Sequence, residues 1–303
     1  MQKCGNNYIP IRWLRMTNLQ VSPVFDALRG PLSRYSSTNM LSRNLTRVIE
    51  PIIGIQEFKL DGDMSNPISF HQALFVCYLF EDSAPFSMQI SNGFQRPITP
   101  GGLVTCSASE PIEMRGHVST LGGIVHGLLL VSSQNLICNP PGESIVHQSV
   151  EQLPLIDLKG AKMRVLIGAT NHGASMAMPN GRLTLIDVSI DKSSTCHFQL
   201  AAGCNAVLYV IVGRIDLSLF YASWRLVAGN AMSVGSSCQP EVVVITAQED
   251  SRAILVIYQP LHGSHSIPSN SADKSRAQPP MQCDRDDEGS SKAFETRVFV
   301  LPI

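Results

Sequence analysis

The sequence predicts an all-β protein, on two observations. Apolar residues gather in short runs rich in Val, Ile, Leu and Tyr, and Gly or Asn commonly separates one run from the next. Such runs are typical of β-strands, whereas no stretch of the chain keeps a long, clean helical period. Many short, closely spaced strands favour a sandwich or a barrel. We expect strands at 74–80, 127–131, 164–167, 182–190, 206–212, 214–220, 241–246 and 252–258.

Two of these strands differ in their expected surroundings. In 214–220, apolar residues alternate with Asp216 and Ser218, so one face of this strand should meet solvent. The run 206–212 is apolar at every position. A strand of that composition fits a place in the core where both of its faces are covered.

The expected strands fall into two similar halves. Pro100, Gly101 and Gly102 precede a strand in the first half, and the segment 227–230 (V-A-G-N) precedes one at the matching point of the second. Gly and Asn suit such sharp reversals because they tolerate positive φ angles. Two β-barrels in tandem therefore fit the chain, one at 48–150 and one at 155–262.

The charge balance excludes some kinds of partner and indicates another. The 303 residues carry 23 Lys and Arg against 24 Asp and Glu, a formal net charge of −1. This balance argues against nucleic-acid binding, which needs a basic face, and no apolar run is long enough for a transmembrane helix. Charged residues make up only 16% of the chain, against about 25% in typical soluble domains. We therefore expect a large core, or a surface covered by a protein partner.

The eight cysteines are scattered along the chain, and no C-x-x-C motif occurs. We therefore expect neither a disulfide framework nor a zinc site. Several of them lie within apolar runs, where a free thiol behaves as a small hydrophobe. The cysteines are Cys4, Cys77, Cys106, Cys138, Cys196, Cys204, Cys238 and Cys283.

Residues 1–47 are interpreted as an N-terminal extension. The first 50 residues contain seven basic residues and two acidic ones, and they are rich in Ser, Thr and Asn. This composition is typical of a mitochondrial transit peptide, and the segment 34–37 (R-Y-S-S) resembles a matrix-protease cleavage site. A disordered extension of a cytoplasmic or nuclear protein is the alternative.

The chain changes character again in the tail, 263–303. Ser, Asn, Pro and Asp dominate 263–293, a composition that cannot bury enough apolar surface to order itself alone. The segment 293–300 then has the pattern of a last strand. It should either return to a sheet edge of its own chain or add to the sheet of a partner.

Five segments together carry a resemblance to a known family: G-G-I-V-H-G-L-L-L at 122–130, and the segments at 160–168, 183–188, 202–213 and 254–261. In their order and spacing they resemble the pirin family, two-domain members of the cupin superfamily, and the first is similar to the family's H-G-L strand. The resemblance covers about 48–262. It implies two tandem cupin barrels, each a double-stranded β-helix or jelly roll. It also implies one iron-class metal in the first barrel, held by an H-x-H and a later H-x-E, for dioxygenase chemistry.

This chain departs from the family at those ligand positions. Ile68 and Phe70 stand where the resemblance places the H-x-H, and Met114 and Gly116 stand where it places the H-x-E. Ile, Phe and Gly offer no donor side chain, and the sulfur of Met is a poor ligand for a hard divalent metal. We therefore expect no metal and no cofactor.

A relocated site is the alternative to a lost one. His71, Glu113 and His117 flank the substituted positions and could form it in an irregular loop. In a regular strand, however, a one-residue slip turns a side chain to the opposite face of the sheet.

The remaining histidines and acidic pairs do not predict a second site. His126 should be a partly buried, hydrogen-bonded ring in its strand, and the resemblance implies no metal near His172 or His197. His262 and His265 lie in the polar tail. Asp61 and Asp63 flank a glycine in a turn and should be solvated. The chain also contains no dinucleotide-binding or phosphate-binding glycine motif and no G-x-S-x-G elbow.

The sequence thus predicts a metal-free, pirin-like protein without enzymatic activity. We expect it to serve as a structural or interaction subunit of a mitochondrial complex, with binding of a small molecule in a barrel as a further possibility. The alternatives are a metal-dependent dioxygenase of the quercetinase type with a relocated iron site, and a redox-linked transcription cofactor in the nucleus.

Overall fold

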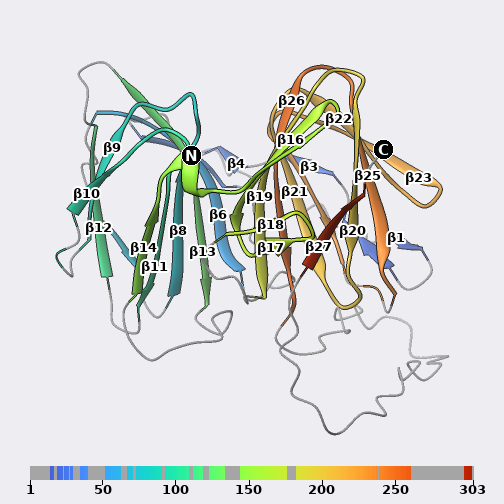
Figure 1. Ribbon diagram of the computed structural model, residues 1–303, viewed down its shortest axis with the longest axis horizontal. Coiled ribbons are helices and arrows are strands. Elements are labelled where there is room, and N and C mark those ends of the chain that lie inside the picture. Colours follow the sequence, from blue (N-terminus) through green and yellow to red (C-terminus); the bar gives the residue numbers. More distant parts are fainter. Residues whose placement is uncertain are drawn as a thin grey trace, which may run out of the picture.

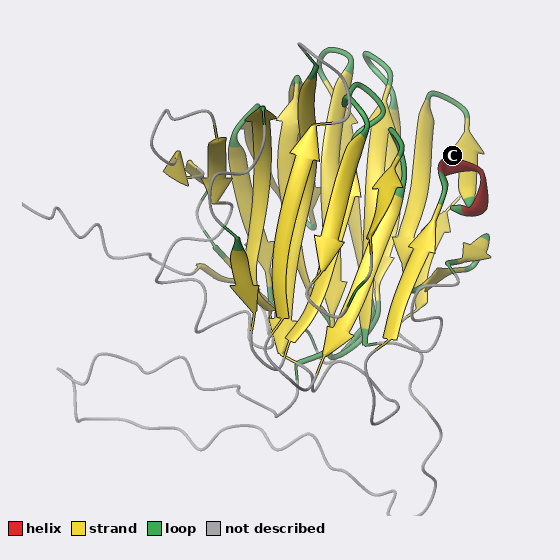
Figure 2. Ribbon diagram, turned by 90° about the vertical axis from the view of Figure 1, so that its left-hand side faces the viewer, coloured by secondary structure: helices red, strands yellow, loops and turns green. Residues whose placement is uncertain are grey.

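The structure is a computed structural model that describes the residues of the two expected barrels and short segments of both ends. The described part contains no α-helix and one 3-10 turn, η2, Val150–Gln152. The prediction of an all-β protein is therefore confirmed, as Figure 2 shows. The described residues are 14–16, 19–22, 24–26, 28–29, 35–39, 52–62, 67–70, 73–90, 93, 95–108, 112–118, 123–133, 144–175, 182–235, 237, 239–260 and 297–301.

The first barrel consists of a seven-stranded sheet and a four-stranded sheet. The larger sheet contains β4 (Leu28–Arg29), β5 (Tyr35–Asn39), β6 (Ile52–Asp61), β8 (Ala73–Leu79), β11 (Leu103–Ala108), β13 (Ile124–Ser133) and β14 (Ser144–Gln148), in the order β14-β11-β8-β13-β6-β5-β4. The smaller sheet contains β7 (Ile68–Phe70), β9 (Phe86–Ile90), β10 (Gln95–Ile98) and β12 (Ile112–Val118), in the order β10-β9-β12-β7.

The second barrel repeats this plan with a nine-stranded and a seven-stranded sheet, and lies beside the first in Figure 1. The larger sheet contains β1 (Leu14–Met16), β2 (Leu19–Val21), β3 (Phe25–Asp26), β15 (Leu155–Leu158), β16 (Ala161–Ile167), β19 (Leu183–Ile190), β21 (Asn205–Val212), β24 (Asn230–Val234) and β26 (Ser251–Tyr258). The smaller sheet contains β17 (Ala169–Thr170), β18 (Gly173–Ala174), β20 (Thr195–Leu200), β22 (Arg214–Leu219), β23 (Ala222–Val227), β25 (Glu241–Ala247) and β27 (Arg297–Leu301), in the order β18-β17-β27-β20-β25-β22-β23.

The described residues form three apolar cores: one inside each barrel and one between them. Strand β8 contributes to two of them, because successive side chains of a strand point to opposite faces. Phe75, Cys77 and Leu79 lie in the first barrel, whereas Val76 and Tyr78 lie in the core between the barrels.

The same alternation explains the strands that are apolar throughout. In β26, Leu255 and Ile257 lie inside the second barrel, and Ile254, Val256 and Tyr258 lie between the barrels. The expectation that 206–212 is covered on both faces is met for 206–211, since β21 supplies these residues to both cores, whereas Val212 at the end of the strand is 54% exposed.

The region interpreted from the sequence as an N-terminal extension contributes strands to both barrels. β2 and β3 pair with β24 of the second barrel, and β5 pairs with β6 of the first. Ser22 is buried, accepts a hydrogen bond from the Ser233 amide at its Oγ (2.8 Å) and donates its own amide to the Ser233 carbonyl (2.9 Å). A cut at 34–37 would separate β1 to β4 from the rest of the chain.

Of the tail, the structure describes β27 alone. This strand pairs antiparallel with β20 and, over two residues, parallel with β17. The last strand thus returns to a sheet of its own chain, which is the first of the two arrangements expected from the sequence. No helix in the described part of the chain is long and apolar enough to cross a membrane.

Candidate functional site

The positions of the family's metal ligands lie on two paired strands of the first barrel. In the register of β7 and β12, Ile68 is opposite Met114 and Phe70 is opposite Ile112. Met114 and Gly116 are buried, and Met114 belongs to the core inside the first barrel. The two substituted pairs are therefore neighbours in space, although nothing is described of the side chains of Ile68 and Phe70.

The flanking residues of the relocated site point elsewhere. Glu113 and His117 are exposed and alternate along β12 with the buried Met114 and Gly116, so they face away from the barrel interior. His71, the third member of that set, lies outside the described residues. Glu113 and His117 thus lie on the opposite face of β12 from Met114 and Gly116.

The interior of the first barrel is filled with apolar side chains. Where it is described, the chain places no group of three or more His, Cys, Asp or Glu side chains around a common point that could hold a metal. Burial raises the pKa of Cys77 to about 12, so its thiol is neutral at physiological pH and is not a ready ligand. The interior residues are Phe58, Leu60, Phe75, Cys77, Leu79, Phe86, Met88, Ile90, Ile98, Val104, Cys106, Met114, Val125 and Leu129.

The second barrel is packed in the same way. Among the side chains that line it lies an apolar cavity of about 10 Å³, bordered by Phe198, Leu208, Leu217 and Leu255 among others. This volume is about the space of a single water molecule. Cys196 is buried there, and its burial raises the pKa of the thiol to about 12.

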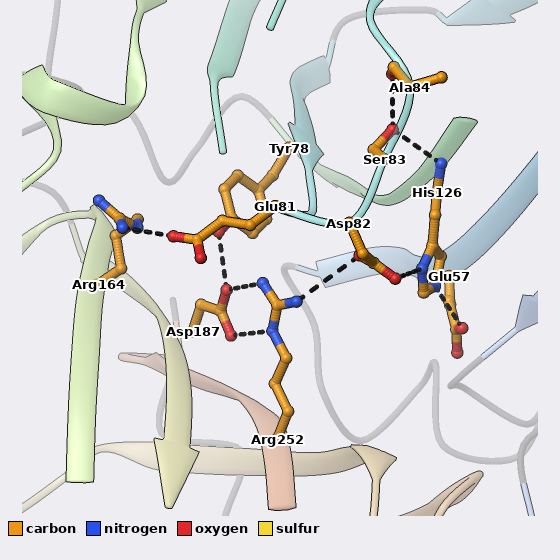
Figure 3. Close-up of polar contacts among 10 residues, drawn as sticks. All are labelled: Glu57, Tyr78, Glu81, Asp82, Ser83, Ala84, His126, Arg164, Asp187 and Arg252. Atoms are coloured by element: carbon orange, nitrogen blue, oxygen red, sulfur yellow. Dashed lines mark hydrogen bonds and ion pairs between the residues drawn. The ribbon is translucent and has the colours of Figure 1, made fainter. Parts of the chain in front are cut away.

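A cluster of polar and ionisable side chains lies between the two barrels, and we call it the seam (Figure 3). Its residues are Glu57, Tyr78, Asp82, His126, Asp187, Tyr209 and Arg252. His126 of β13 is buried with its Nε2 2.8 Å from Glu57 Oε1 and its Nδ1 3.0 Å from Asp82 Oδ2. Its backbone amide donates to Ser83 Oγ (3.0 Å), and its ring meets Phe80 edge-on. The expectation of a buried, hydrogen-bonded ring is therefore met.

The second barrel supplies the opposite half of this seam. Asp187 of β19 accepts hydrogen bonds from the Arg252 guanidinium of β26, at Oδ1 from Nε (2.9 Å) and at Oδ2 from Nη2. Both residues are largely buried, and the guanidinium also lies 4.5 Å from the centre of the Phe80 ring. A bidentate pair of this kind is among the stronger charge-assisted contacts in proteins.

Polar contacts then cross from one barrel to the other. The Tyr78 hydroxyl donates to Asp187 Oδ2 (2.7 Å), and the Tyr209 hydroxyl donates to Glu57 Oε2 (2.5 Å). Arg252 Nη1 lies 3.8 Å from Asp82 Oδ1. A further ion pair joins Arg164 of β16 to Glu81, beside the segment that links the barrels.

The contacts of the seam lower the pKa values of two of its carboxylates, Glu57 and Asp82. Burial by itself would raise the pKa of Glu57, but the hydrogen bonds from His126 and Tyr209 outweigh it, and the pKa is lowered. The pKa of Asp82 is lowered in the same way, since the contact with His126 overcomes the desolvation. For Arg252, burial opposes the charged form, yet the contacts with Asp187 raise the pKa above its usual value. Burial and the neighbouring Asp187 both raise the pKa of Tyr78, which therefore stays a neutral donor.

Sequence reasoning missed most of this cluster. The sequence feature that pointed to the cluster was the presence of charged residues in otherwise apolar strands. Asp187 lies within L-T-L-I-D-V, and Arg252 begins the apolar run 252–258. Two other histidines that the structure describes lie apart from the seam: His172 is exposed in a turn, and His197 is half-buried on β20. Asp61 is exposed at the end of β6, and Asp63, His262 and His265 lie outside the described residues.

Several solved structures have a fold similar to that of this chain. GK1651 from Geobacillus kaustophilus superposes with a TM-score of 0.69 at 16% identity, over 80% of this chain and 96% of that one. Quercetin 2,3-dioxygenase from Acinetobacter baumannii gives a TM-score of 0.67 at 15% identity, over 79% of this chain and 86% of that one. The bacterial pirin YhhW from Escherichia coli, in complex with nickel(II), gives 0.59 at 11% identity, over 79% and 100%. The chain has the two-domain cupin fold.

The bicupin fold is what these similarities establish. The prediction of two tandem cupin barrels is therefore confirmed. No protein-family model and no curated protein matches the sequence. Because the sequence identities to these structures are 16% or less, the similarity is one of fold alone.

Proposed function

We propose that this protein is a metal-free, pirin-like bicupin that serves as a structural or interaction subunit of a larger assembly. The proposal rests on the side chains that face the interior of the first barrel. Met114 and Gly116 face its interior from β12, and the side chains packed around Met114 are apolar. These residues do not fit a divalent metal of the kind the cupin fold commonly holds.

The seam supports the same proposal. Asp187 and Arg252 of the second barrel contact Tyr78 and Asp82 of the first, and Tyr209 of the second barrel contacts Glu57 of the first. Such an arrangement holds two domains in a fixed relation, which suits a subunit that presents a constant surface. The low share of charged residues, 16%, agrees with a protein whose surface is partly covered by a partner.

Elemental analysis tests the proposal directly. The full chain is expressed with excess iron, purified without chelator, and assayed for iron, manganese, nickel, copper and zinc, with the nickel-binding bacterial pirin purified in parallel as a positive control. We expect less than about a tenth of an equivalent of any metal, and no change of melting temperature on adding EDTA. One equivalent that is lost in His71→Ala or His117→Ala would instead identify a dioxygenase with a relocated iron site.

The location is proposed on composition alone. The seven basic and two acidic residues among the first 50 support import into mitochondria. A fluorescent protein fused to the C-terminus should then label mitochondria. A nuclear signal would favour the redox-linked transcription cofactor.

A further inference from the structure

The hairpin of β22 and β23 ends in two exposed aromatic residues. Phe220 and Tyr221 form its two-residue turn, with half of Phe220 and all of Tyr221 open to solvent. Phe220 has a φ of +53°, in the left-handed region that such turns usually give to Gly, Asn or Asp. A bulky residue is strained there, and strain of this kind gathers at functional sites. The hairpin projects from the side of the second barrel in Figure 1.

β23 is also the last strand of its sheet. Among the described residues its only strand neighbour is β22, so its other edge is open to a further strand. Natural proteins commonly protect an open edge with Pro, Lys or a bulge. The sequence of β23, A-S-W-R-L-V, contains neither Pro nor Lys, and it pairs with β22 without a break in register.

The sequence of this hairpin is complementary to itself. In an antiparallel pair centred on Trp224, Tyr221 would meet Val227 of a second copy, and Ala222 would meet Leu226. Ser223 would meet Arg225, so the one charged residue of the strand would not face its own copy. Tyr221 and Val227 are both exposed in the single chain, at 104% and 43%. Trp224 is partly buried and packs against the core of the second barrel.

We propose that β23 pairs with β23 of a second copy of this chain, antiparallel and centred on Trp224. The seven-stranded sheet that contains β23 in one copy then continues into the same sheet of the other copy across a two-fold axis. The exposed Tyr221 of each copy covers the exposed Val227 of the other. An interface of this symmetry uses the same patch on both copies. The proposal rests on the hairpin and is independent of whether the first barrel binds a metal.

Sedimentation velocity of the full chain at concentrations up to about 100 µM tests the interface, because edge-strand contacts of this size are weak. We expect the wild type to form a dimer and Tyr221→Lys and Val227→Lys to remain monomers at the same concentration. Ile124→Lys is the matched control, since Ile124 is also exposed, at 55%, but lies on the first barrel. It should dimerise like the wild type.

The register has its own test at Ser223. Ser223→Asp would place a carboxylate beside Arg225 of the second copy and should lower the dimer dissociation constant several-fold. Ser223→Lys would place two cations together and should raise the constant by a similar factor. A wild type that stays monomeric, a dimer that survives both Tyr221→Lys and Val227→Lys, or equal effects of the two Ser223 variants would overturn the proposal.

Discussion

The interior of the first barrel and the seam between the barrels are built by the same strands with opposite chemistry. β8 turns Cys77 into the barrel and Tyr78 toward the seam, where its hydroxyl contacts Asp187. β13 likewise sends Val125 inward and His126 to the seam. In this bicupin, polar and charged side chains such as Tyr78, Asp187 and Arg252 join the two barrels. The interior of the first barrel, in contrast, is a packed apolar core.

The largest effect is expected from breaking the seam at its most buried carboxylate. Asp187→Ala leaves the Arg252 charge and the Tyr78 hydroxyl without their partner in a site where Asp187 is 6% exposed. Removing one member of a buried ion pair typically destabilises a protein by about 3–5 kcal/mol. Urea unfolding measures the loss.

Asp216→Ala is the matched control for that change. Asp216 also pairs with an arginine, Arg225, but the arginine is largely exposed. Exposed pairs contribute at most about 1 kcal/mol. Equal losses in the two variants would mean that the seam is no more than a solvated surface contact.

The next effect concerns the interior of the first barrel. Met114→Ala removes a buried side chain from the core of the first barrel and should cost about 2–5 kcal/mol, as in other packed cores. Arg115→Ala, on the outer face of the same strand, should stay within about 0.5 kcal/mol of the wild type. A negligible loss in Met114→Ala would indicate an open binding cavity in place of a packed core.

A smaller effect is expected from one hydroxyl of the seam. Tyr209→Phe removes the hydrogen bond to the ionised Glu57, and bonds to charged groups contribute about 1.5–3 kcal/mol. Tyr258→Phe is the control, because the Tyr258 hydroxyl contacts the neutral Asn205 at 3.3 Å, where the loss should be about 0.5–1.5 kcal/mol. If the two variants are equally stable, Glu57 does not depend on Tyr209.

The smallest effect is expected at Asp82, which is 63% exposed. Asp82→Asn should cost less than about 1 kcal/mol at neutral pH. Because His126 lowers the pKa of Asp82 in the folded state, its contribution is fully present above the ordinary value of 3.8. It is lost as the pH falls through the lowered pKa, so wild type and variant should converge in acid. Urea unfolding across an acid series checks this, and a difference that persists at the acid end contradicts it.

Local patterns in the sequence were enough to predict the barrels. The apolar run at 74–80 predicted β8, and the unbroken run at 206–212 predicted a strand covered on both faces, because side-chain alternation is a property of each strand by itself. The turn glycines were also predictable: Gly101 and Gly229 have φ angles of +75° and +88° ahead of β11 and β24. The resemblance also put its expected ligand positions on two segments that pair in the structure, where Ile68 is opposite Met114.

The seam and the N-terminal strands could not be predicted in this way. Tyr78 and Asp187 are 109 residues apart and Glu57 and Tyr209 are 152 apart, so no local pattern links them. Residues 1–47 have the composition of an extension, yet Ser22 is buried against Ser233. The sequence alone determined the strands and their covered faces, since these depend on residue type and period. The tertiary structure decided which charges meet and which strands complete each sheet, because those contacts exist only once two distant segments are packed together.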